Sequence, residues 1–394
     1  MLDRSTPRQT TLGEPAHEAH VEQDLARAAT GIASELGDGL SALWLVGPLA
    51  RGEGGMVSDR GELTTYPGYE LIAVLRRKPA RHSAALRSLS GAWSRLLGTR
   101  LFLAGIGARA VPHLPATRFW LEAQSGSLRT LAGDPELARH IPELDATRLP
   151  SRETFALIAS AFTAIALGEL EQVSPRAKTE RLHAAVLAVG DTLLLRNGQL
   201  PPSWRERAAA LDHVRGAGEL ALLYRSAIAF FARPDHWTPS GVSVATWLEQ
   251  TRRSLSHAYL AHEATRIQAP IHVFGYMRHP DPITSSHSEH RDAAAPPSLA
   301  RRARLLAMRV PTLAALAVDP LDRLVRASVA LAFAADAPAC RTHVAAYLGI
   351  RTAFGAADDD ELAKALRSLA GGLLDDPIGA PFARLSFDPP APTR

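Results

Sequence analysis

The sequence predicts an α+β protein, in which an N-terminal domain with a mixed sheet is followed by a large all-α C-terminal region. Short apolar runs of strand length alternate with helical patterns up to about residue 135, and from Pro150 onward nearly every segment has helical spacing. The chain has 394 residues, of which 46% are hydrophobic and 21% are charged. This length and composition predict two or three domains with buried cores and exclude wholesale disorder.

The N-terminal part alternates between helical and strand patterns. Residues 1–20 are polar and patternless, which predicts a flexible N-terminal arm, and residues 21–148 form the predicted α/β domain. Apolar residues at helical spacing predict helices over about 21–36 and 80–97. Four short apolar runs predict the strands 41–46, 69–75, 101–104 and 117–122.

The C-terminal part is predicted as a helical domain over 149–269 and a second helical region over 298–394. A capping box from Ser203 to Glu206 predicts one helix start. The other predicted helices cover about 152–170, 177–196, 217–232, 243–266, 298–309, 320–335, 338–352 and 359–370. Residues 270–297 are rich in Pro, His and Ser without an apolar period, which predicts an irregular insertion. Its histidines, His279, His287 and His290, are more typical of a solvated loop than of a metal site.

Composition excludes several functional classes. The single cysteine, Cys340, excludes a disulfide framework and favours a reducing, cytoplasmic compartment. The net charge of +4 comes without a concentrated basic stripe, so there is no strong nucleic-acid signal. Residues 154–168 are uncharged but too short to cross a bilayer, and no signal peptide pattern opens the chain, so we expect no membrane partner.

One segment carries a chemical pattern. Residues 45–55 contain a strand end, a glycine turn and an Arg-Gly-Glu sequence, and residues 68–75 begin the next strand with a carboxylate at its second position. This arrangement resembles the polymerase-β-type nucleotidyltransferase superfamily, and the rest of the chain resembles bacterial members with a helical C-terminal domain. In that superfamily a Gly-Ser turn cradles nucleotide phosphates, and carboxylates from neighbouring strands hold two Mg²⁺ ions for nucleotidyl transfer.

The resemblance implies roles for individual residues. The turn residues would contact a nucleotide, and two carboxylates would be catalytic Mg²⁺ ligands. The implied nucleotide-contacting residues are Gly47, Arg51, Gly52 and Glu53. The implied catalytic and metal-binding residues are Glu70 and Glu122, the latter on the predicted fourth strand.

Two positions depart from the superfamily pattern. Pro48 stands where a serine is usual, which removes a hydroxyl and a backbone N–H donor. Gly68 stands where the first aspartate, which bridges both metals, is usual. Asp59 or Glu62 supplies the missing carboxylate only if the segment between the glycine turn and the next strand folds back. Restoring Asp at position 68 and Ser at position 48 is expected to raise Mg²⁺ and nucleotide affinity.

Three functions are compatible with this degenerate motif. The first is a nucleotidyltransferase-fold protein with an inactive centre, acting as a scaffold or regulator that binds a nucleotide or a protein partner. The alternative is an active Mg²⁺-dependent nucleotidyltransferase that moves a nucleoside monophosphate to a small molecule or protein. The second alternative is a purely structural, helix-rich assembly component. Outside the motif, Asp191 lies in an apolar helix, where a buried carboxylate requires a partner, and Arg205 and Arg207 are the candidates.

Overall fold

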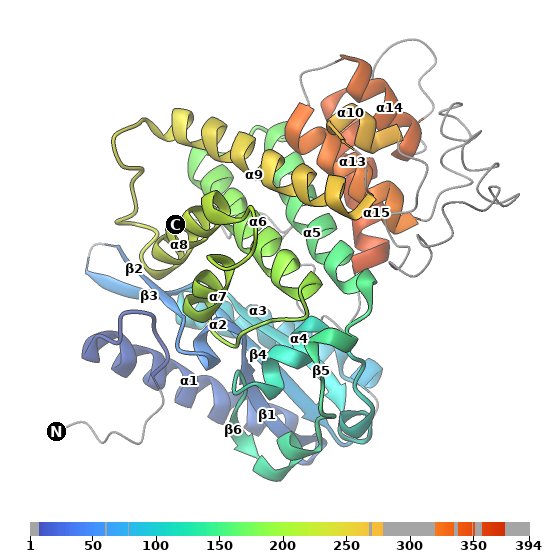
Figure 1. Ribbon diagram of the computed structural model, residues 1–394. Coiled ribbons are helices and arrows are strands. Elements are labelled where there is room, and N and C mark those ends of the chain that lie inside the picture. The colour runs from blue at the N-terminus through green and yellow to red at the C-terminus, as the bar shows by residue number, and fades with distance from the viewer. Residues whose placement is uncertain are drawn as a thin grey trace, which may run out of the picture.

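The structure, a computed structural model, describes residues 8–267 apart from 60 and 78, and residues 270–278, 320–334, 338–348, 350 and 357–374. A small sheet with its flanking helices forms the N-terminal part, and a body of helices stands on one side of it (Figure 1). The predicted α+β class is confirmed.

The main sheet is mixed and has the strand order β5-β4-β1-β6. The central strand β1 is antiparallel to both neighbours, whereas β4 and β5 are parallel and are joined through a helix. The four strands are β1 (Leu40–Val46), β4 (Tyr69–Leu75), β5 (Leu101–Gly107) and β6 (Arg129–Gly133). A separate antiparallel hairpin, β2 (Gly55–Asp59) with β3 (Glu62–Tyr66), interrupts the connection from β1 to β4.

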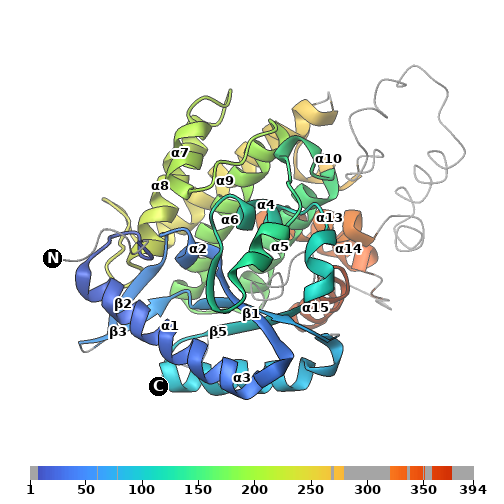
Figure 2. The same cartoon turned by 90° about the horizontal axis from the view of Figure 1, so that it is seen from below.

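Successive side chains of β1 alternate between the two faces of the sheet, as strand geometry requires. Leu43 and Leu45 pack in the same core as α1 (Pro15–Leu36) and α3 (Ser83–Leu97), which Figure 2 shows along one side of the sheet. Trp44 and Val46 pack on the opposite face. That second face is covered by α4 (Arg118–Gln124) through Trp120 and Ala123, and it is the face turned towards the helical body.

The helical body has one continuous apolar core, centred on the antiparallel pair α5 and α6. Glu153–Leu170, in α5, is the one stretch of the described residues with the length and hydropathy to cross a membrane, and 72% of it is buried, as in the core helix of a globular domain. The helices are α5 (Ser151–Leu170), α6 (Pro175–Arg196), α7 (Trp204–Leu211), α8 (Gly218–Ala232), α9 (Val244–Ile267), α10 (Val273–Arg278), α13 (Pro320–Ala334), α14 (Pro338–Leu348) and α15 (Asp359–Leu374).

Two predictions for the N-terminal part differ from the structure. Residues 1–7 of the predicted flexible arm lie outside the described residues, but residues 8–20 are held in place, since α1 begins at Pro15 and the backbone N–H groups of Gln9 and Thr10 donate to Glu18 at 2.8 and 2.9 Å. The predicted fourth strand is the helix α4, which Thr117 caps by accepting from the Trp120 backbone N–H. Six residues with three consecutive apolar members fit a buried strand and a short buried helix equally well, and the cap decides for the helix.

The predicted irregular insertion is wrong at its start, where residues 273–278 form α10 and Tyr276 is fully buried. The remainder of that segment, including His279, His287 and His290, lies outside the described residues, as does the predicted helix over 298–309.

Candidate functional site

The glycine turn and Glu70 lie side by side. Val46, the last residue of β1, pairs with Glu70 on β4, and the chain then turns at Gly47 with a φ of 73° into the short helix α2 (Gly47–Ala50). A Cβ atom on Gly47 would lie 2.2 Å from the Glu70 carboxylate Oε2. Position 47 therefore requires glycine for two reasons: its backbone conformation is left-handed, and Glu70 occupies the space that a Cβ atom would need.

Glu70 is half-buried, and its carboxylate makes no hydrogen bond or ion pair with any residue that the structure describes. Burial raises the pKa of its carboxyl group to about 7, with Arg51 opposing the shift and Glu122 adding to it. Without a bound cation this carboxyl group is therefore partly protonated near neutral pH.

Glu122 is buried and bonded to three arginines. Its Oε1 accepts from Arg118 at 2.7 Å and lies 3.1 Å from Arg207, and its Oε2 accepts from Arg51 at 3.1 Å. Burial opposes ionisation of this carboxyl group, but the three guanidinium groups outweigh it and lower the pKa to about 2. Glu122 is therefore a permanently charged centre of an ion-pair network.

The network continues into the helical body through Asp191 on α6. Arg118 and Arg207 reach Asp191 Oδ2 at 3.1 and 2.9 Å, and the Tyr224 hydroxyl donates to Oδ1 at 2.7 Å. The prediction that Asp191 pairs with an arginine of the following helix is confirmed for Arg207, which is fully buried. These contacts join α4 of the N-terminal part to α6, α7 and α8.

Glu53 links the turn to the start of α7. It accepts from Arg51 Nε at 2.6 Å and from the backbone N–H of Trp204, the first residue of α7, where a negative charge is favourable. The Arg51 guanidinium also lies 5.5 Å from the centre of the Trp204 ring. Burial raises the pKa of Glu53, and Arg51 opposes that shift.

The residues at the turn do not fit a Mg²⁺ ion. Both oxygens of Glu122 and both oxygens of Glu53 are already taken by arginine or backbone donors, which leaves Glu70 as the one unengaged carboxylate of the three. In the part of the chain that the structure describes, no group of three His, Cys, Asp or Glu side chains is placed to hold a metal. Glu62 is exposed at the tip of the hairpin, so it does not replace the missing aspartate.

Of the residues proposed from sequence, the structure brings Gly47, Arg51, Glu53, Glu70 and Glu122 together at one place. The remaining turn residue, Gly52, has a φ of 76° and faces the backbone of Arg8.

Sequence reasoning missed Arg118 and Tyr224. The signal for Arg118 was its i, i+4 spacing to Glu122, which indicates neighbours only if the segment is helical.

No family model, curated protein or solved structure matches this chain. The function is therefore argued from the geometry at the turn.

Proposed function

We propose that the protein is a non-catalytic member of the polymerase-β-type nucleotidyltransferase superfamily that acts as a scaffold or regulator by binding a protein partner. The observation that carries this proposal is the position of the Glu122 carboxylate, which three guanidinium groups contact at 2.7 to 3.1 Å. In the superfamily the third carboxylate lies on a strand and binds Mg²⁺, whereas Glu122 lies on the helix α4 and neutralises arginine.

The ion pairs have a structural consequence that suits a scaffold. Arg118 and Arg207 each contact both Glu122 and Asp191, so the same guanidinium groups hold the α/β domain and the helical body together. Buried charges in such an arrangement are costly to separate. The two parts of the molecule are thus fixed relative to one another, as a scaffold that presents a constant surface to a partner requires.

A protein partner is favoured over a nucleotide because the cations at the turn are engaged. Arg51, Arg118 and Arg207 all contact carboxylates, and a phosphate group would have to displace one of them. The short helix α2 adds little, because Pro48 supplies no N–H donor.

Calorimetry with the four nucleoside triphosphates, with and without Mg²⁺, tests the proposal. We expect no Mg²⁺-dependent binding and no release of pyrophosphate. Binding of a nucleotide without Mg²⁺ and without turnover would indicate that the ligand is a nucleotide and not a protein partner. The proposal of an inactive centre would still hold.

The second candidate, Mg²⁺-dependent nucleotidyl transfer, is favoured by one observation, the unengaged Glu70 carboxylate beside the turn. Turnover that is lost in Glu70→Ala and kept in Glu62→Ala, an exposed control, would overturn the inactive centre and establish this candidate.

A further inference from the structure

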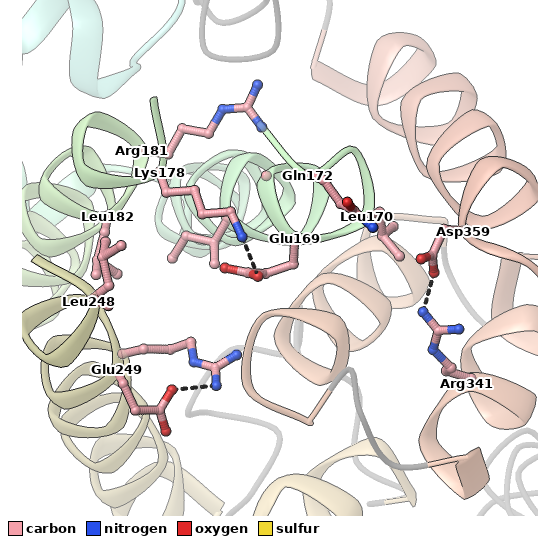
Figure 3. Close-up of a pocket in the computed structure, with 14 residues that line it drawn as sticks. Glu169, Leu170, Gln172, Lys178, Arg181, Leu182, Leu248, Glu249, Arg341 and Asp359 are labelled. Atoms are coloured by element: carbon pink, nitrogen blue, oxygen red, sulfur yellow. Dashed lines mark hydrogen bonds and ion pairs between the residues drawn. The ribbon is translucent and has the colours of Figure 1, made fainter. Parts of the chain in front are cut away.

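A cavity of about 420 Å³ lies within the helical body, between the end of α5, the start of α6, and α9, α14 and α15. Figure 3 shows side chains from these helices around it. It is lined by no residue of the α/β domain, so nothing about it depends on the chemistry of the glycine turn.

Ion pairs occupy three sides of the cavity (Figure 3). Three cations and three carboxylates of the lining form these pairs, so the six side chains carry no net charge, and Glu249 is also bonded to Arg253, outside the lining, at 2.7 Å. The pairs are Lys178 with Glu169 at 2.8 Å, Arg252 with Glu249 at 2.6 Å, and Arg341 with Asp359.

Arg181 is the seventh charged residue in the lining, and no ion-pair partner for it lies among the residues that the structure describes. Arg181 is 8% exposed. Its guanidinium donates one hydrogen bond to a described residue, to the backbone oxygen of Ala164 at 3.2 Å. Two carboxylates, Glu171 and Glu180, act on it from beyond ion-pair distance, and Glu171 is bonded to Arg367. Burial accordingly lowers the pKa of the Arg181 guanidinium. A buried cation without a counter-charge is costly, which indicates a site that an anion completes.

Gln172 is a second, independent sign of a built site. It follows the end of α5 with a φ of 47°, and it is the one non-glycine residue with a positive φ among the described residues. Glycine is favoured at this left-handed position after a helix. Gln172 is an exposed residue that lines the cavity from such a position, so its side-chain amide is available to a ligand there.

We propose that this cavity binds a small organic monoanion with an apolar body. Arg181 supplies the one unmatched positive charge and Gln172 a hydrogen-bonding amide. Leu170, Leu182 and Leu248, which also line the cavity, provide the apolar surface. The single unmatched guanidinium favours a carboxylate over a phosphate monoester, which carries a charge of about −1.5 to −2 at pH 7.

Three eight-carbon probes that differ in charge test this proposal by calorimetry: octanoate, octylamine and octanol. We expect octanoate to bind the full-length protein, and octylamine and octanol to bind at least about 10-fold more weakly, because a hydrogen bond to a charged group contributes about that factor or more. Octyl phosphate in the same titration distinguishes the two anionic head groups. No octanoate binding up to about 5 mM, or equal binding of octylamine, would overturn the proposal.

Substitutions locate the site. Arg181→Gln should weaken octanoate about 10-fold or more, whereas Arg181→Lys should keep most of the affinity. Arg176→Gln, at an exposed position of the same helix, is the matched control and should change nothing.

A second variant, Gln172→Gly, separates a loss of binding from a loss of folding. It should lower octanoate affinity while leaving the thermal midpoint unchanged or raised, because glycine relieves the left-handed backbone. Unchanged affinity in both Arg181→Gln and Gln172→Gly would place octanoate elsewhere and refute the site.

Discussion

Replacing Arg207 tests whether the ion-pair network holds the two parts of the molecule together. The side chain is fully buried, contacts Glu122 at 3.1 Å and Asp191 at 2.9 Å, and also donates to the backbone oxygens of Pro201 and Pro202. Removing one partner of a buried ion pair costs about 3–5 kcal/mol, and the two carbonyl groups left without a donor add about 1 kcal/mol. Arg207→Gln should therefore lose roughly 4–6 kcal/mol.

Differential scanning calorimetry and urea denaturation measure this loss. At about 2–4 °C for each kcal/mol, the midpoint should fall by about 10 °C or more. Arg205→Gln is the control on the same helix, because Arg205 is exposed and its replacement should stay within about 0.5 kcal/mol.

The loss should also depend on pH. The pKa of Glu122 is lowered from 4.5 to about 2, so its stabilisation is present above pH 4.5 and disappears as the pH falls towards 2. Arg207→Gln should thus differ most from the parent near pH 7 and least near pH 3. Equal losses in Arg205→Gln and Arg207→Gln, or a difference that does not change with pH, would refute the reasoning.

Three further substitutions test the turn. Gly47→Ala should destabilise the fold by about 1–3 kcal/mol in urea denaturation, because its Cβ meets Glu70 at 2.2 Å and its φ is 73°. The loss should shrink in a Glu70→Ala background, and an equal loss there would contradict the collision. Glu70→Gln should gain about 1–2 kcal/mol over the parent at pH 8 and nothing at pH 4, since a carboxyl pKa raised from 4.5 to about 7 makes stability fall as the pH rises through that interval. A gain that is the same at both pH values would contradict it. Gly68→Asp, the change expected from sequence to restore Mg²⁺ binding, should lower stability without a gain in Mg²⁺ affinity, because φ at Gly68 is 139° and a Cβ would lie 2.4 Å from the backbone oxygen of Arg100. Calorimetry with Mg²⁺ that detects a gain would show that the backbone adapts.

The sheet around the turn follows from local pattern. The apolar runs at 41–46, 69–75 and 101–104 all lie within strands of one sheet, and Glu70 falls beside Gly47 as predicted. Such runs are recognisable because a strand buried on both faces needs apolar side chains at successive positions. The capping box of Ser203 and Glu206 is likewise present at the start of α7, since its two hydrogen bonds span only three residues.

The ion-pair network does not follow from local pattern. Arg51 and Glu122 are 71 residues apart in the sequence, so their contact depends on how α4 packs on the sheet. Arg118 and Asp191 are 73 apart, and their contact depends on how the helical body packs against α4. The hairpin β2–β3 is also missed, because residues 62–66 are largely polar and show no alternation of buried apolar positions.

Charge balance explains why Glu70 stands apart from the other carboxylates. Four carboxylates and three guanidinium groups meet around the turn and its junction with α6: Glu53, Glu70, Glu122 and Asp191, with Arg51, Arg118 and Arg207. The three arginines match three negative charges, and the fourth carboxylate, which burial already penalises, holds a proton up to about pH 7. A Mg²⁺ ion entering here would gain one firm ligand at most and would have to separate arginines from carboxylates to gain another. The guanidinium groups thus neutralise the carboxylates that a metal ion would need, and the arrangement that stabilises the junction is the one that opposes Mg²⁺-dependent chemistry.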